Sequence, residues 1–518
     1  MSKFGKEFEK IWPELNDHKT LTKTAEKHLK KYLKSKVPVK NTDLDKFQQK
    51  SKNFPIEFPI DSCRVESQPV ERHDVIREQI ESAYPLIHEK VLYLIIDFLE
   101  HKLRYGSSCE RKLYKNMSIC EFVQRLLTKR CVSFVGTEDD YLLLTGETGF
   151  GRQYLKVGCK EEREPLTLTN VLSYDEIKIS ALLSVSSKTE FINDGNRYNK
   201  GLRELDSSKI EQQGLVVGMI GARFERKEVM EFQDITITRN QNTLENGYGG
   251  SLDKPKQNPG FLHNLNPFKK PTNLEKLQDY RRLWNRFYEE PDHLYDQVHK
   301  DNLRFGDTLN CLVIFDNVMM KKRYAISFDM LLLEANSRAL PNQAYLHVVG
   351  FGLGVWRAAV QQEQIFMECF YERLRYLLPL LKNIGVVHFS YFNLKECGEL
   401  KNEGFMASKY HPKGGIKTFI SKRNPHDKLP EEFKDMLLVV SYAWDGNALP
   451  GNEFWLGNLT GSNDPSTACS TLISELHNPH INTEFVCGDN LHIASFNYNI
   501  INIYDYAKKV LKSDLTRQ

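Results

Sequence analysis

The sequence lacks the features that assign a chain to several common classes. None of its apolar runs approaches the roughly 20 residues that cross a bilayer, and its N-terminus has no apolar signal region. Its ten cysteines contain no Cys-x-x-Cys pair, which argues against a zinc site and favours a reduced protein. A net charge of only +3 predicts neither a nucleic-acid partner nor a membrane surface. We therefore expect a cytoplasmic protein whose partners include no nucleic acid and no membrane.

Several catalytic motifs are missing as well. The chain has no Gly-x-Ser-x-Gly nucleophile elbow, and none of its cysteines has an adjacent histidine that could activate it. Gly146–Gly151 lacks the Gly-Lys-Ser/Thr ending of a phosphate loop, so we interpret it as a turn between strands. His388, His477 and His480 are not paired at metal-ligand spacing. We predict no metal and no cofactor.

The length of 518 residues predicts two or three packed units. The first 53 residues carry 14 lysines and only 7 acidic residues, and we interpret residues 1–60 as a basic, flexible arm. Residues 61–208 are expected to form a helical and α+β region that contributes to a ligand cleft, and residues 209–518 an α/β domain. A loop insertion rich in Gly, Pro and Asn occupies residues 247–273.

The last third of the chain alternates strand and helix patterns. Apolar strands are predicted at Tyr345–Val349, Val386–Phe389 and Met436–Ala443, with a long helical pattern between the first two. Such near-continuous apolar strands are typical of a sheet that is buried on both faces. We therefore expect an α/β fold with helices on both faces of the sheet.

The densest group of reactive side chains follows the third of these strands. Trp444–Trp455 contains the carboxylates of Asp445 and Glu453 together with the carboxamides of Asn447 and Asn452. Ligands of α/β proteins bind at the carboxyl ends of strands, and these side chains can hydrogen-bond the hydroxyls of a sugar. The same composition also suits an ordinary turn, which is the alternative interpretation.

Asp464 stands before a helical pattern and admits two interpretations. As the N-cap residue, with Pro465 in the first helical position, it has a purely structural role. It also follows Glu453 by only eleven residues, so one pocket could hold the carboxylates of Asp445, Glu453 and Asp464.

A glycine-rich turn follows the first strand of the series. In Gly350–Trp356 a buried strand enters a turn before a helix, an arrangement that aims backbone N–H groups at a diphosphate. A nicotinamide dehydrogenase is disfavoured, because the spacing is Gly-x-Gly-x-Gly and the next strand ends in Ser390–Asn393 without a ribose-binding acid. Asn193–Asn196 most simply forms a turn, although its side chains could contact a ligand.

Taken together, these segments resemble the macrodomains, and among them the MavL-like class. The resemblance covers roughly residues 120–500, and its specific part is the block Trp444–Ser470, in which a strand opens into an Asn-Ala, Gly-rich loop. The other matching segments are Phe191–Gly195, Gly221–Glu225, Gly350–Trp356 and Gly461–Pro465. The resemblance implies a macrodomain-like mixed sheet covered by helices, with an N-terminal extension and an ADP-ribose-binding catalytic domain at residues 209–518.

The resemblance also implies an activity, the removal of mono-ADP-ribose from arginine side chains of proteins. The implied catalytic residues are Asp445, Glu453 and Asp464. The candidate ligand-binding residues are Gly350, Gly352, Leu353, Gly354, Val355, Trp356, Asn447, Gly451, Asn452, Asn193 and Phe224. The first three glycines of that set are the implied cradle for the diphosphate, and Phe224, Phe191 and Asn193 are candidates for holding the adenine.

Elementary chemistry agrees with this activity. A guanidinium is a planar cation with a fork of donors, which carboxylates accept, and negative charge stabilises the oxocarbenium character that develops when a glycosidic bond breaks. Three other classes stay open: a non-catalytic ADP-ribose reader, an NAD-consuming transferase and a scaffold protein. The transferase is disfavoured because the sequence has no convincing Arg, Ser-Thr-Ser and Glu-x-Glu set.

Overall fold

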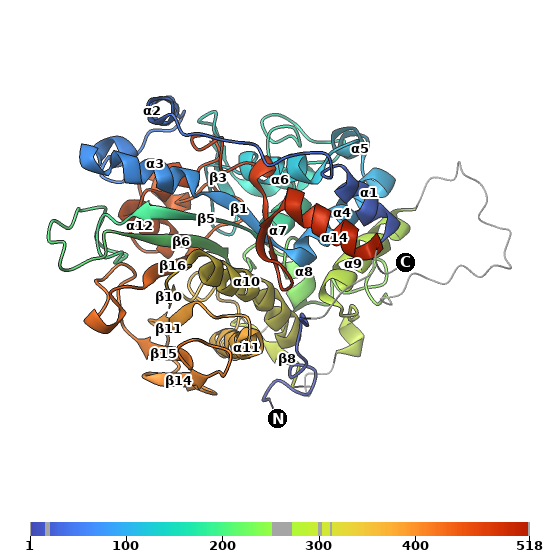
Figure 1. Ribbon diagram of the computed structural model, residues 1–518. Helices are drawn as coiled ribbons and strands as arrows, with labels where there is room; N and C mark the ends of the chain where they lie inside the picture. Colours follow the sequence, from blue (N-terminus) through green and yellow to red (C-terminus); the bar gives the residue numbers. More distant parts are fainter. Residues whose placement is uncertain (1, 16–20, 251–271, 299–302, 311–312, 516–518) are drawn as a thin grey trace.

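The computed structural model describes residues 2–15, 21–250, 272–298, 303–310 and 313–515, and its centre is a ten-stranded mixed sheet (Figure 1). The strand order is β14-β15-β11-β10-β16-β6-β5-β1-β17-β18. In that order the strands are Gly404–Ala407, Gly415–Ser421, Ile384–Ser390, Ala344–Val348, Leu437–Trp444, Gln213–Ile220, Leu183–Glu190, Tyr84–His88, His492–Ser495 and Asn499–Asn502. The central strands from β15 to β6 all run parallel, so their carboxyl ends meet at one edge of the sheet.

Helices cover both faces of this sheet. Ser186 and Ser187 are consecutive on β5, so their side chains point to opposite faces. Ser186 Oγ donates to Glu334 Oε1 of α10 at 2.7 Å, whereas Ser187 Oγ lies 2.9 Å from His477 Nε2, directly after α13. The helices around the two faces include α10 (Asn317–Arg338), α11 (Gln362–Leu377), α12 (Asn463–Ser470) and α13 (Ile473–Leu476). The expected α/β fold with a helix-covered mixed sheet is confirmed.

The long helix α10 occupies the middle of the molecule, where Figure 1 shows it in front of the central strands. All of its residues from Asn317 to Asn336 are buried, charged ones included. Arg323 Nε donates to Glu231 at 2.7 Å, and Arg373 of α11 pairs with Asp329 at 2.7 Å. Because the helix has no exposed face, it lacks the polar-to-apolar alternation by which helices are predicted from sequence.

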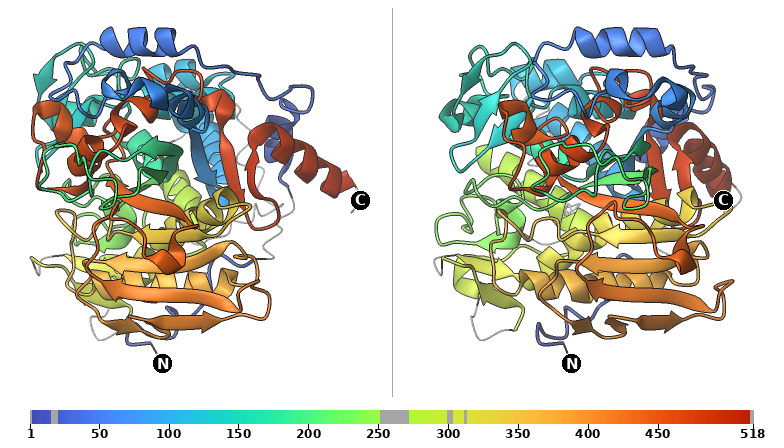
Figure 2. Two further views of the ribbon diagram at one scale, coloured as in Figure 1. Left: turned by 60° about the vertical axis from the view of Figure 1, so that its left-hand side comes forward. Right: turned by 90° about the vertical axis from the view of Figure 1, so that its left-hand side faces the viewer.

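The remaining helices gather around the amino-terminal strands and the outer end of the sheet (Figure 2). They are α1 (Lys23–Lys30), α2 (Leu44–Lys52), α3 (His73–Glu81), α4 (Glu89–Tyr105), α5 (Ser108–Tyr114), α6 (Ile119–Thr128), α7 (Tyr174–Ser180), α8 (Phe232–Ile235), α9 (Asn273–Tyr288) and α14 (Ile503–Leu515). A small sheet of β2 (Ser133–Val135), β3 (Asp140–Leu142) and β4 (Thr148–Gly149) accompanies them. Each described helix is too short or too polar to cross a bilayer.

The predicted boundary at 208/209 falls inside the large sheet rather than between two units. β5, before the boundary, pairs antiparallel with β6, after it, and β1 pairs with β17 near the end of the chain. The polar segment between β5 and β6 therefore connects neighbouring strands. Of the predicted insertion at 247–273, residues 251–271 lie outside the described part of the chain.

The N-terminal arm differs from the flexible segment that its lysine content predicts. Phe4, Phe8 and Trp12 are buried, and the Lys321 ammonium of α10 donates to the backbone oxygens of Phe8 and Lys10. Further along, α1 packs against α4 and α14. Three aromatic side chains at four-residue intervals explain the attachment, because the apolar area that they bury outweighs the solvation of the lysines around them.

The docked arm makes the first testable prediction. Trp12 packs its ring against Phe287 and Tyr288, so Trp12→Ala should lower the free energy of unfolding by about 3–5 kcal/mol. Val39→Ala, at a 95% exposed position of the same arm, is the control and should leave stability unchanged. Denaturant unfolding measures both, and equal stability of the two variants would show that the arm is only loosely attached.

Candidate functional site

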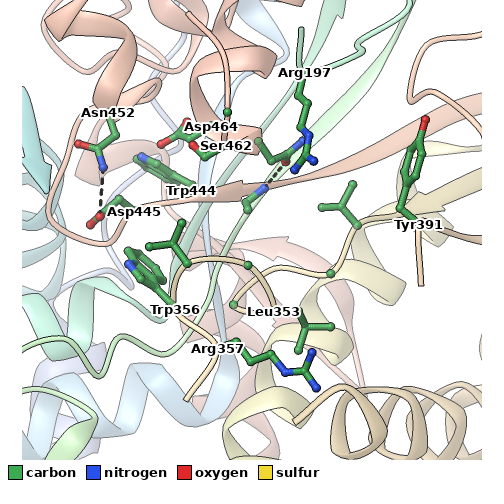
Figure 3. A pocket seen from close by; sticks show the side chains of 18 of the residues that line it. Arg197, Leu353, Trp356, Arg357, Tyr391, Trp444, Asp445, Asn452, Ser462 and Asp464 are labelled. Carbon is green, nitrogen blue, oxygen red and sulfur yellow. Dashed lines mark hydrogen bonds between the residues drawn. The ribbon is translucent and has the colours of Figure 1, made fainter. Parts of the chain in front are cut away.

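A pocket of about 620 Å³ opens at the carboxyl ends of the parallel strands (Figure 3). Loops that follow strands form much of its wall: Glu225 after β6, Gly350–Arg357 after β10, Tyr391–Asn393 after β11 and Asp445–Glu453 after β16. Gly195–Tyr198, in the connection between β5 and β6, also lines the pocket. The topology thus brings stretches that lie far apart in the sequence to one cavity.

Three carboxylates lie at one end of this pocket, and the backbone and neighbouring side chains fix each of them. Asp445 Oδ1 accepts the N–H of Asn447 at 3.0 Å, and its Oδ2 accepts Asn452 Nδ2 at 3.3 Å. Asp464 Oδ1 accepts the N–H of Gly451 at 2.8 Å. The third, Glu453, accepts the Ser462 hydroxyl at 3.2 Å. The predicted acidic residues therefore do share one pocket.

Burial shifts all three carboxyl groups toward the neutral form. It raises the pKa of Asp445 to about 7, against the opposing effect of the Arg223 guanidinium. It also raises the pKa of Glu453, and the pKa of Asp464 goes well above its usual range because the charges of Glu453 and Asp445 add to burial. Like charges in a dry pocket repel one another, so the cluster binds protons until a cation replaces them.

One oxygen of the cluster has no hydrogen-bond donor of its own. Asp464 Oδ2 is buried and has no hydrogen-bond partner in the described part of the chain. A buried carboxylate oxygen without a donor is costly, and a bound donor would remove that cost. Within the described residues no group of three or more His, Cys, Asp or Glu side chains is arranged to hold a metal ion. A ligand that brings a positive charge together with a hydrogen-bond donor would meet both needs of this position.

Arginine and a fourth carboxylate complete the acidic end. Arg223 donates to Asp139 at 2.6 Å and to Glu225 at 2.9 Å, and Glu225 lines the pocket. The charge of Glu225 contributes to the raised pKa values of both Asp445 and Glu453. Its pocket position was not predicted, although its segment belongs to the resemblance described above.

The glycine-rich turn leaves donors and space for a ligand. A Cβ atom on Gly221 would lie 2.6 Å from the Cα of Gly352, so the loops after β6 and β10 touch through their backbones. Gly352 has a positive φ of 74°, which favours glycine. The N–H groups of Gly354, Val355 and Trp356 make no hydrogen bond with the described residues. Such exposed N–H groups at a strand-to-helix turn suit an anion.

The pocket contains most of the predicted residues. Those that line it are Asp445, Glu453, Asp464, Gly350, Gly352, Leu353, Gly354, Val355, Trp356 and Asn452. Whether they bind a ligand stays a prediction, since the structure holds none.

Four predicted ligand-binding residues lie outside the pocket lining. Asn447 is fully buried under the loop, and its amide nitrogen donates to the Tyr154 hydroxyl at 3.4 Å. Gly451 serves the loop through its positive φ of 103° and its N–H bond to Asp464. Asn193 Oδ1 accepts the N–H of Gly195 at 3.0 Å, and Phe224 packs on Phe315 with ring centroids 5.8 Å apart. These residues shape loops around the site instead of facing its space.

Two further expectations need correction. The Asp464 side chain does not cap α12, because the helix begins at Asn463, after Ser462, and Asp464 uses its carboxylate to hold Gly451. Phe191, considered for the adenine, stacks on His426 with ring centroids 3.9 Å apart and is buried. A carboxylate in the first turn of a helix can cap that helix or hold a neighbouring loop, and sequence spacing alone did not distinguish the two roles.

Another part of the pocket wall was missed by sequence reasoning. Arg197, Tyr391 and Arg357 line it, and the hydroxyl of Tyr391 donates to Asn424 at 2.7 Å. Tyr391 is 56% exposed and has a φ of 65°, a left-handed conformation that is strained for this residue. Its place directly after β11 was the available signal, because the loops after parallel strands form the binding edge.

Comparison with known proteins now identifies the family. Residues 45–509 match the family model described as ADP-ribosylhydrolase MavL-like. The chain belongs to the MavL-like family. It is 51% identical over 519 residues to the ADP-ribosylarginine hydrolase CG2909 of Drosophila melanogaster, covering 99% of both chains. It is 50% identical over 504 residues to the ADP-ribosylarginine hydrolase CG3568 of the same fly, covering 97% of this chain and 95% of that one.

The buried acids of this MavL-like protein make a second prediction, about stability. The folded-state pKa of Asp464 is raised, so the folded state binds more protons than the unfolded state above about pH 4, and stability falls as pH rises. Asp464→Asn removes this loss and should raise the melting temperature near pH 8 by roughly 1–3 °C. The gain should disappear below about pH 3, where Asp464 is protonated in both states.

The exposed variant Asp435→Asn is the control for this experiment, and its melting temperature should follow the parent at every pH. A melting temperature of Asp464→Asn below the parent at pH 8 would mean that the ionised carboxylate stabilises the fold, contrary to the argument.

Proposed function

We propose that this protein hydrolyses the N-glycosidic bond between ADP-ribose and the arginine side chains of proteins. The observation that carries the proposal is the buried acidic cluster, with a carboxylate oxygen that lacks a donor, beside a turn with free backbone N–H groups. Identity of about half over nearly the whole chain to two proteins named ADP-ribosylarginine hydrolases supports the same activity.

The pocket has a matching place for each part of the substrate. The diphosphate fits the N–H groups of Gly354–Trp356, and the distal ribose fits between them and Asp445. The arginine guanidinium then reaches Glu453 and Asp464, whose carboxylates accept its fork of donors. The adenosine extends in the other direction, toward Tyr391 and Arg197. In this sense the site is macrodomain-like.

The reaction needs a water molecule, an oriented carboxylate and a stabilised leaving group. Asp445 suits the water-activating role, because a pKa of about 7 matches a general base at neutral pH. Water adds to the anomeric carbon as the bond to the guanidine nitrogen breaks, and the proton lost by the water ends on the released guanidine. The neighbouring carboxylates Glu453 and Asp464 stabilise the oxocarbenium character of the transition state.

The location of the protein and its partners are further parts of this proposal. The cytoplasm is the proposed location, and ADP-ribosylated proteins are the proposed partners, with no role for nucleic acid or membranes. The ester of a glutamate linkage and the ether of a serine linkage are both neutral and offer the carboxylates neither a positive charge nor a fork of donors, so arginine linkage should be strongly preferred.

The catalytic assignment gives the third prediction. Asp445→Asn should lower kcat on arginine-modified peptide by about 10²–10⁴-fold with little change in KM. Glu453→Gln should raise KM as well, because it loses half of the guanidinium clamp. Both should still bind free ADP-ribose with parent affinity. Release of ADP-ribose from peptides modified on arginine, serine or glutamate measures turnover, and calorimetry measures binding.

Glu475→Gln is a matched control for this assignment. Glu475 is also buried with its pKa raised to about 7, but it lies outside the pocket, where it accepts the N–H of Val65 at 2.6 Å. Its variant should keep parent turnover. Binding of ADP-ribose without any release from arginine by the parent protein would indicate a reader, and parent rates in both pocket variants would discard the assigned roles.

The adenosine end gives the fourth prediction. If Tyr391 stacks on the base, Tyr391→Ala should weaken ADP-ribose binding by about 1–3 kcal/mol. Affinity for ribose 5-phosphate, which has no base, should be unchanged. Tyr410, 55% exposed and outside the pocket lining, provides the control variant Tyr410→Ala. Equal losses for both ligands would assign Tyr391 to the shape of the loop and not to base recognition.

A further inference from the structure

A buried arginine lies behind the acidic loop, on the side away from the pocket. Arg130 follows α6, is 3% exposed and does not line the cavity. Its guanidinium stacks over the ring of Trp444 at 4.1 Å, and its Nε donates to the carbonyl of Gly446 at 3.2 Å. These two residues flank Asp445 in sequence. Arg130 therefore holds the chain on both sides of the carboxylate at the centre of the proposed reaction.

Ser180 connects Arg130 to the same turn. The Ser180 hydroxyl accepts Arg130 Nη2 at 2.8 Å and donates to the Gly446 carbonyl at 2.6 Å, and the Ser180 carbonyl accepts Nη2 at 3.2 Å. The loop after β16 thus rests on a network contributed by the end of α7 and the residues after α6. Its anchor belongs to the amino-terminal half of the chain.

The charge of Arg130 is unusual among the buried arginines. Arg323, Arg373 and Arg223 each contact a carboxylate within 2.7 Å. Arg130 forms no ion pair with the described residues, and the acids that act on its charge are Asp445 and Asp464. A buried cation without a direct counter-ion is expensive, so its position behind two buried acids calls for a role.

We propose that Arg130 is a positioning residue that fixes the Trp444–Asn447 turn and whose positive charge opposes the protonation of Asp445 and Asp464. Its benefit for catalysis rests on the proposed function, but its effect on the two carboxylates does not. Burial lowers the pKa of Arg130 to about 9, which leaves the guanidinium charged at neutral pH. Neutral bonds to Ser180 and Gly446 leave its field free to act on the acids.

Several other charged groups also act on the pKa values of Asp445 and Asp464. Arg223 lowers the pKa of Asp445, whereas Glu453 and Glu225 raise it. Glu453 and Asp445 raise the pKa of Asp464. The other titratable neighbours stay neutral near pH 7: burial raises the pKa of Cys131 to about 12 and that of Tyr442 well above its usual range, and His477, beside Tyr442, has its pKa lowered to about 3. Arg223 and Arg130 are thus cations held beside the acidic loop, whereas Arg197 and Arg357 reach the same pocket from other loops.

The test separates charge from anchoring. Arg130→Met removes the charge and should move the acidic limb of the pH profile of kcat/KM upward by about half a unit to one unit. Arg130→Lys keeps the charge but loses the fork of donors, so it should lower kcat and leave the limb near its parent position. Ser180→Ala loosens the turn with the charge intact and should behave like the lysine variant. Affinity for free ADP-ribose should be unchanged in all three.

An unmoved limb in Arg130→Met, or an equal shift in Ser180→Ala, would overturn the proposal in favour of a purely structural role. Arg130→Gln is a second neutral variant for use if the methionine variant does not fold. The carboxyl carbon signals of aspartate, assigned with Asp445→Asn, report the same shift by NMR without turnover. If the parent protein releases no ADP-ribose from arginine, the proposed function fails, while the NMR titration still decides whether Arg130 controls the two carboxylates.

Discussion

The constraint on which this structure depends is the confinement of several carboxylates in one water-poor pocket. Removing a carboxylate from water is costly, and placing a second beside it adds repulsion. The fold offsets that cost in three ways: backbone N–H groups hold individual oxygens, two arginines lie nearby, and protons remain on part of the cluster. The empty cluster still lacks positive charge and hydrogen-bond donors, and a substrate guanidinium brings both. Affinity for an arginine-linked substrate and instability of the empty site thus have the same origin.

Parallel strands explain why such a site can be built at all. β6, β10, β11 and β16 end at the same edge, so each contributes one loop to a common cavity. The apolar runs of these strands were recognisable in the sequence, because a strand buried on both faces needs no polar alternation. The carboxylates, glycines and carboxamides of the loops were recognisable because each group stands directly after such an apolar run. Local chemistry at strand ends is therefore the most predictable part of this site.

Other parts depend on contacts that spacing does not encode. Helix α10 escaped prediction because its charged residues pair inside the core, as Arg323 does with Glu231. The N-terminal arm was misjudged because lysine content outweighed three regularly spaced aromatic residues. Asn447 and Asn193 have the chemistry of ligand-binding groups, but their side-chain amides bond to neighbouring protein groups and hold loops. The segment around Tyr391 matched no known ligand-binding motif. The residue type shows which hydrogen bonds a side chain can form. Only the packing decides whether its partner is another part of the protein or a ligand.

The shared sheet gives the amino-terminal region a direct part in the site. β5 and β6 pair across the predicted boundary, and the residues after α6 and at the end of α7 support the turn that carries Asp445. Separating the two regions would expose a strand edge and withdraw Arg130 from behind two buried acids. An acidic cluster of this kind needs counter-charge that does not compete with the substrate for its oxygens. A cation placed behind the loop, bonded to neutral groups, meets that requirement, whereas one in the pocket would occupy the position of the guanidinium.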